Sequence, residues 1–84
     1  MSLYNTSLFK VKKTKDSEIK ETLLEVATIL RNKGYNPVHQ IVGYITTGDP
    51  VYITNEGNAR HKIRLLDRNK VIEVLLASYL KWES

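Results

Sequence analysis

Residues 34–54, GYNPVHQIVGYITTGDPVYIT, constrain the fold of this chain more than any other segment. They contain three of its four glycines, both prolines and three of its five tyrosines. No lysine or arginine lies between Lys33 and Arg60, although the chain of 84 residues carries a formal net charge of +4. A segment with large aromatic side chains and almost no charge is a poor solvated surface and a good packing surface. We therefore expect it at the centre of the fold.

The first part of this segment predicts a helix. Asn36 is a typical N-cap, and Pro37 is suited to the first helical position, where its missing N–H does no harm. Gly48 is placed to end the helix in a left-handed conformation. A strand over QIVGYIT stays open as an alternative, because β-branched residues dominate there. The helical interpretation rests on apolar residues at i, i+3, i+4 and i+7, namely Val38, Ile41, Val42 and Ile45.

Three further helices are expected around this one. Residues 17–34 read as a helix that Asp16 or Ser17 caps and Gly34 stops. After Asp49-Pro50 we expect only a single turn or an extended link, followed by a third helix capped by Thr54 or Asn55. Asp67 caps a fourth. The apolar positions are Ile19, Leu23, Val26 and Leu30 in the first helix, Ala59, Ile63 and Leu66 in the third, and Val71, Ile72, Leu75, Leu76, Tyr79 and Leu80 in the fourth, which we expect to be buried on a broad face.

The predicted fold is therefore all-α, a small bundle of about four short helices over residues 16–84 with a flexible basic tail over residues 1–15. A chain this short buries only about 60% of the surface that its unfolded form exposes, so the core is thin. The chain has no cysteine and therefore no disulfide, and dimerisation is the remaining source of buried area. Neither a signal peptide nor an apolar run long enough for a membrane span is recognisable, which predicts a cytoplasmic location.

The residue types argue against catalysis and against a metal or cofactor site. The two histidines, His39 and His61, lie far apart in the sequence, and neither is spaced to serve a serine or lysine nucleophile. Without cysteines they give no recognisable ligand spacing. The glycines of YITTGDP do not form a phosphate-binding pattern. We expect a protein that is not an enzyme and holds no metal or cofactor.

Nucleic-acid binding is an alternative. A helix, a tight GDP turn and a helix with Arg60 and Arg64, followed a turn later by Arg68, have the outline of a helix-turn-helix. Asp67 and the weakly basic balance of the chain weigh against this interpretation.

The N-terminal tail suggests a switch operated by phosphorylation. Four lysines surround the apolar residues Leu8, Phe9 and Val11, and hydroxyl side chains flank them. A phosphate on Thr6 or Ser7 adds about −1.5 to −2 charges next to Lys10, Lys12 and Lys13, which cancels much of the local positive field.

The central segment, KGYNPVHQIVGYITTGDPVYIT followed by NAR, resembles the signature of the IreB family of small proteins from low-GC Gram-positive bacteria. The acidic first helix and the C-terminal VIEVLLASYL extend the resemblance over nearly the whole chain. It implies a non-enzymatic, mainly helical homodimer in cell-envelope stress signalling. It also implies phosphorylation by a transmembrane Ser/Thr kinase with extracellular PASTA repeats and dephosphorylation by a partner phosphatase.

The resemblance places phosphorylation on N-terminal threonines. Thr6, three residues before Phe9, matches one of them, whereas Leu3 stands where the family can have a second. Ser2 and Ser7 are the remaining candidates in the tail.

For the central segment we expect the centre of the fold and of a symmetric dimer interface, or else packing within one protomer only. The residues concerned are Tyr35, Ile41, Gly43, Tyr44 and Tyr52.

Overall fold

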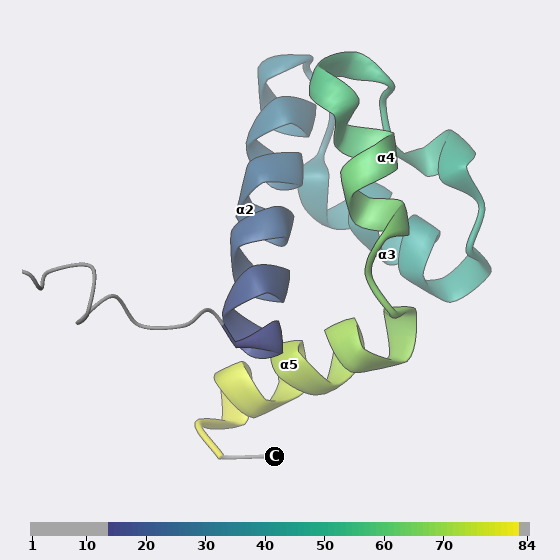
Figure 1. Ribbon diagram of the computed structural model, residues 1–84. Coiled ribbons are helices and arrows are strands. Elements are labelled where there is room, and N and C mark those ends of the chain that lie inside the picture. Colours follow the sequence, from purple (N-terminus) through teal and green to yellow (C-terminus); the bar gives the residue numbers. More distant parts are fainter. Residues whose placement is uncertain (1–13, 83–84) are drawn as a thin grey trace, which may run out of the picture.

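The computed structural model describes residues 14–82, and these fold into four α-helices without a strand (Figure 1). Two short 3-10 turns, η1 (Pro50–Tyr52) and η2 (Glu56–Asn58), lie between the second and third of them. The all-α prediction is confirmed, and the alternative strand over QIVGYIT is wrong. The predicted homodimer stays a prediction. The α-helices are α2 (Lys15–Asn32), α3 (Pro37–Thr47), α4 (Ala59–Arg64) and α5 (Arg68–Leu80).

Helix α2 is the axis of the fold, because each of the other three helices packs against it. In Figure 1, α4 runs alongside α2, α3 lies behind α4, and α5 crosses the foot of α2. Two ion pairs join α2 to the segment around α4: Lys62 Nζ lies 2.7 Å from Glu25 Oε2, and Lys33 Nζ lies 3.4 Å from Glu56 Oε2. Both pairs are well exposed, so each contributes at most about 1 kcal/mol.

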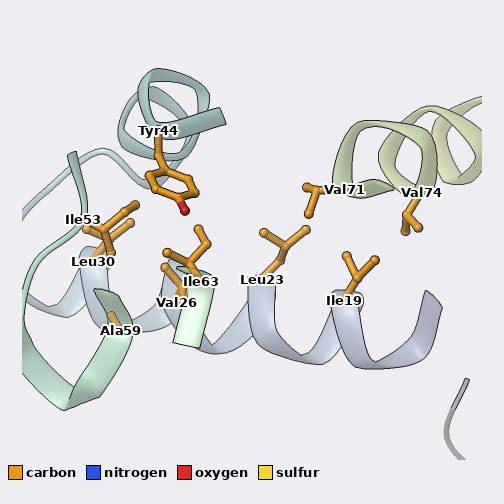
Figure 2. Close-up of a cluster of buried hydrophobic side chains, with 10 residues drawn as sticks. All are labelled: Ile19, Leu23, Val26, Leu30, Tyr44, Ile53, Ala59, Ile63, Val71 and Val74. Atoms are coloured by element: carbon orange, nitrogen blue, oxygen red, sulfur yellow. The ribbon is translucent and has the colours of Figure 1, made fainter. Parts of the chain in front are cut away.

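The core is a single row of apolar side chains along α2, and residues from α3, from α4, from α5 and from the end of η1 cover it (Figure 2). The α2 row is the predicted one, and Val26 and Leu30 in it are fully buried. Because the residues opposite come from several short elements, each of which contributes only one or two of them, the core holds the elements together more than it stabilises any one of them. The buried residues are Ile19, Leu23, Val26 and Leu30 of α2, with Tyr44, Ile53, Ala59, Ile63, Val71 and Val74 opposite.

The ends of α2 show what local signals specify. Gly34 has φ 91°, and the N–H groups of Gly34 and Tyr35 donate to the carbonyls of Arg31 and Leu30, which confirms the predicted stop. The predicted caps, Asp16 and Ser17, are wrong. Thr14 is the N-cap, and its Oγ1 accepts a hydrogen bond of 3.0 Å from the N–H of Ser17. The helix therefore begins at Lys15, two residues before the predicted start.

Helix α3 has the predicted ends. The Asn36 side chain accepts from the N–H of His39, Pro37 is at the first helical position, and Gly48 ends the helix in the left-handed region with φ 75°. Asp67 likewise caps α5, where its Oδ1 accepts from the N–H groups of Asn69 and Lys70.

The start of α4 differs from the prediction. Neither Thr54 nor Asn55 caps it, because η2 intervenes and two successive residues, Gly57 and Asn58, adopt left-handed φ values of 58° and 60°. This turn brings Ala59 onto α2, where it is fully buried. The first residue of α4 is therefore the residue that this turn buries, Ala59.

The expectation that α5 is buried on a broad face is wrong. Only Val71 and Val74 are buried, whereas Leu75 is 45% exposed and Tyr79 is 84% exposed. The reason is the crossing geometry: α5 passes over the foot of α2 and touches it along one narrow strip (Figure 1).

Candidate functional site

The central segment, residues 34–54, folds back on itself after α3, and Tyr52 then lies over Gly43. A Cβ atom added to Gly43 would lie 2.5 Å from Cδ1 and Cε1 of Tyr52, far closer than van der Waals contact allows. Gln40 holds the same residue in place, because its Nε2 donates a 2.9 Å hydrogen bond to the Tyr52 carbonyl. Within this protomer the close contact at Gly43 is therefore made by Tyr52 of η1.

The TGDP turn that follows α3 is bonded internally. The N–H of Asp49 donates to Thr47 Oγ1 at 3.0 Å, and the N–H of Val51 donates to Asp49 Oδ1 at 3.0 Å. Gly48 supplies the left-handed conformation between these two bonds. Each polar side chain of the turn thus satisfies a backbone N–H group of the turn itself.

Two arginines anchor this turn to the C-terminal half of the chain. Arg68 Nη1 donates a 2.9 Å hydrogen bond to the carbonyl of Ile45, in the last turn of α3. Arg60 Nε donates to the carbonyls of Pro50 and Ile53, each at 3.1 Å. Carbonyls at a helix C-terminus lack intrahelical partners and carry partial negative charge, so a cation is well placed there. Both arginines therefore have a structural task in this protomer.

The three arginines predicted as a nucleic-acid surface belong to two different helices. Arg60 and Arg64 belong to α4, whereas Arg68 is the first residue of α5. Two 3-10 turns, η1 and η2, stand between the GDP turn and α4, so the predicted sequence of helix, tight turn and helix is wrong in this respect. Nucleic-acid contact through these side chains stays a prediction.

The five residues expected at a packing or dimer interface have different surroundings. Tyr44 points into the core and is 6% exposed (Figure 2). Gly43 is covered by Tyr52, and Ile41 is partly buried. Tyr35, by contrast, is 48% exposed.

The predicted phosphoacceptors, Thr6, Ser2 and Ser7, lie outside the described residues. Thr14 is described, and its hydroxyl is engaged as the cap of α2.

The two histidines are exposed and lie on separate helices, His39 on α3 and His61 on α4. Within residues 14–82 no cluster of three or more histidines and carboxylates is arranged to hold a metal ion. None of the helices in this part of the chain has the length and hydropathy to span a membrane.

Sequence reasoning missed two features. Gln40 fixes Tyr52 from twelve residues away, and no local signal marks such a bond. The second is an apolar groove of about 350 Å³ between α2, α3 and α5, lined in part by Leu24, Val38 and Leu75. Helical periodicity assigned Val38 and Leu75 to the core, whereas the structure leaves both exposed.

The described residues therefore define a small all-α protein. Its central segment forms an internally bonded turn, and Arg60 of α4 and Arg68 of α5 bind backbone carbonyls on either side of this turn. The chain belongs to the IreB family: the family model described as "IreB regulatory phosphoprotein" matches residues 4–81. Two relatives are called "UPF0297 protein". The one from Ruminiclostridium cellulolyticum is 48% identical over 96% of this chain and 92% of its own length. The one from Acetivibrio thermocellus is 48% identical over 96% of this chain and 90% of its own length. The resemblance recognised in the central segment is thus confirmed.

Proposed function

We propose that this chain is a non-catalytic regulatory phosphoprotein of cell-envelope stress signalling that acts as a homodimer in the cytoplasm. Its partners in this proposal are a transmembrane PASTA-type Ser/Thr kinase and the cognate phosphatase. The observation that carries the proposal is the match to a family of regulatory phosphoproteins over residues 4–81, which includes the tail with Thr6.

In this proposal Thr6 is the phosphoacceptor, with Ser2 and Ser7 as further candidates. The phosphate changes the tail charge by about −1.5 to −2 close to Lys10, Lys12 and Lys13. A change of that size alters which charged surfaces the tail attracts, while the helical domain that begins at α2 stays the same. In this proposal, regulation depends on whether the tail is phosphorylated and on the surface of the helical domain, whose fold does not change.

The test is intact-mass spectrometry with fragmentation on the protein purified from its own host, grown with and without a cell-wall antibiotic. We expect one added phosphate on Thr6 whose occupancy responds to the antibiotic and which disappears in Thr6→Ala. Ser7→Ala is the matched control and should keep the phosphate. An unmodified tail under both conditions would contradict the signalling role.

A further inference from the structure

A groove lies between the N-terminal half of α2 and the link from α4 to α5. One part of it, about 460 Å³ in volume, reaches from the first turn of α2 to the start of α5, and a second part of about 340 Å³ continues along α2 towards α4. Leu65 and Leu66 line both parts, and Leu65 is 73% exposed. We call the two parts together the acidic groove; its main residues are Glu18, Glu21, Leu65, Leu66 and Asp67.

Carboxylates outnumber cations in and beside the acidic groove. Its lining holds three carboxylates and three lysines. Two of these lysines pair with further carboxylates, Lys62 with Glu25 and Lys70 with Glu73, and the third is Lys15. Three lysines and five carboxylates give this surface a formal net charge of −2, in a chain whose net charge is +4. The groove therefore attracts a cationic segment.

The N-terminal tail joins the helical domain at this groove. Thr14 is the N-cap of α2, and the next residue, Lys15, lines the groove. A chain extends by at most about 3.6 Å per residue, so Phe9 can lie up to about 18 Å from Thr14. Glu18 and Glu21 lie only about 6 and 10 Å from Thr14 along the helix axis. Both carboxylates are within reach of the residues that precede α2.

The chemistry of residues 8–13, LFKVKK, complements the acidic groove. They carry three lysines and no acid. In an extended chain Phe9 and Val11 point to the same side, so both can cover Leu65 while the lysines lie near the carboxylates. A tethered segment has an effective concentration in the millimolar range, so individually weak contacts are sufficient to hold it.

We propose that residues 8–13 bind in the acidic groove of the same protomer, with Phe9 and Val11 against Leu65. A phosphate on Thr6 brings about −1.5 to −2 charges towards a negative surface and attracts the tail lysines to itself, so it releases the tail. The groove is then covered in the unmodified protein and open in the phosphorylated one. Release by phosphate rests on the proposed function, whereas docking of the unmodified tail is independent of it.

Trypsin measures the docking, because it cuts a segment only while that segment is free. Leu65→Ser removes the apolar contact at a position exposed enough to leave the fold intact. Val51→Ser is the matched control, because Val51 is 69% exposed and lies on η1, outside the groove. Mass spectrometry of the full chain should show cleavage after Lys10, Lys12 and Lys13 about fivefold faster in Leu65→Ser and within about twofold of the wild-type rate in the control.

A double-mutant cycle tests the release. Thr6→Glu, in place of the phosphate, should speed cleavage about threefold in the otherwise wild-type chain and have no further effect in Leu65→Ser, where the tail is already free. An equal acceleration in both backgrounds would mean that the carboxylate acts on the protease and not on docking, which would overturn release by phosphate.

The outcomes separate this inference from the proposed function. Equal cleavage of the wild-type chain, Leu65→Ser and Val51→Ser would overturn the inference and leave the proposed function standing. Protection that disappears on dilution would show that the tail binds a second copy, which overturns docking within one protomer. A tail that is protected as expected but carries no phosphate in the host would overturn the proposed function and release by phosphate, and would leave the docking itself supported.

Discussion

Replacing Gly43 with alanine tests how tightly η1 packs against α3. In an isolated helix this change is favourable by about 1 kcal/mol, because alanine restricts the unfolded chain and favours the helix. Here the new Cβ would lie 2.5 Å from two ring atoms of Tyr52 and 2.9 Å from its Cγ. Because even Cγ, the ring atom bonded to Cβ, is too close, the overlap is relieved only by a change of the Tyr52 χ1 angle or by a shift of η1, and the Gln40 side chain, which binds the Tyr52 carbonyl, opposes that shift.

The expected result is a net loss of stability. Overpacking of this kind costs about 1–3 kcal/mol, and loss of the Gln40 bond adds about 0.5–1.5 kcal/mol. After the helix propensity gain of about 1 kcal/mol is subtracted, Gly43→Ala should lower the free energy of unfolding by about 0.5–3.5 kcal/mol. For a domain of this size, each kcal/mol corresponds to a fall in Tm of about 4–8 °C.

A double-mutant cycle with Tyr52→Ala makes the test decisive. When the ring is absent, the Cβ has space, and Gly43→Ala should become stabilising by up to about 1 kcal/mol. Urea denaturation followed by circular dichroism measures all four proteins, at one fixed protein concentration because association changes apparent stability. If Gly43→Ala stabilises the protein equally in both backgrounds, the argument from the close contact is refuted.

Two further predictions concern the anchoring of the central segment. Arg68→Met removes the hydrogen bond to the Ile45 carbonyl and should cost about 0.5–1.5 kcal/mol in urea denaturation, whereas Arg64→Met, at an exposed position on α4, should change stability by less than about 0.5 kcal/mol. An equal effect of the two would argue against the anchoring role, and loss of salt-dependent RNA or DNA binding without loss of stability would favour the nucleic-acid alternative. Asn36→Ala removes the cap of α3 and should cost about 1 kcal/mol, measured in the same way; an unchanged unfolding midpoint would show that the cap is dispensable.

Local signals predicted most of the fold. The Asn36-Pro37 start, the Gly48 end and the Asp67 cap each depend on the conformational preferences of one or two residues, which act wherever those residues stand. The apolar row of α2 was predicted equally well, because α2 is long enough for its period to be unambiguous. For the candidate site, the sequence indicated that the central segment packs tightly at Gly43.

Other features depend on contacts between distant residues, and local signals did not predict them. The start of α4 is set by where Ala59 meets α2. The roles of Arg60 and Arg68 depend on carbonyls seven to twenty-three residues away. Spacing alone suggested a nucleic-acid surface formed by Arg60 and Arg64, with Arg68 a turn later. It cannot distinguish a solvated arginine from one that binds the backbone.

The sequence by itself determined that this protein is helical, where four of its helix ends lie and to which family it belongs. These properties follow from the conformational preferences of single residues and from a long sequence motif. Neither depends on contacts that form only in the folded protein. The tertiary structure alone decided which apolar residues are buried. Periodicity places Val71 and Leu75 on the same line of α5, yet Val71 is 2% exposed and Leu75 is 45% exposed. The difference arises because the crossing of α5 over α2 covers one strip and leaves the next to solvent or to a partner.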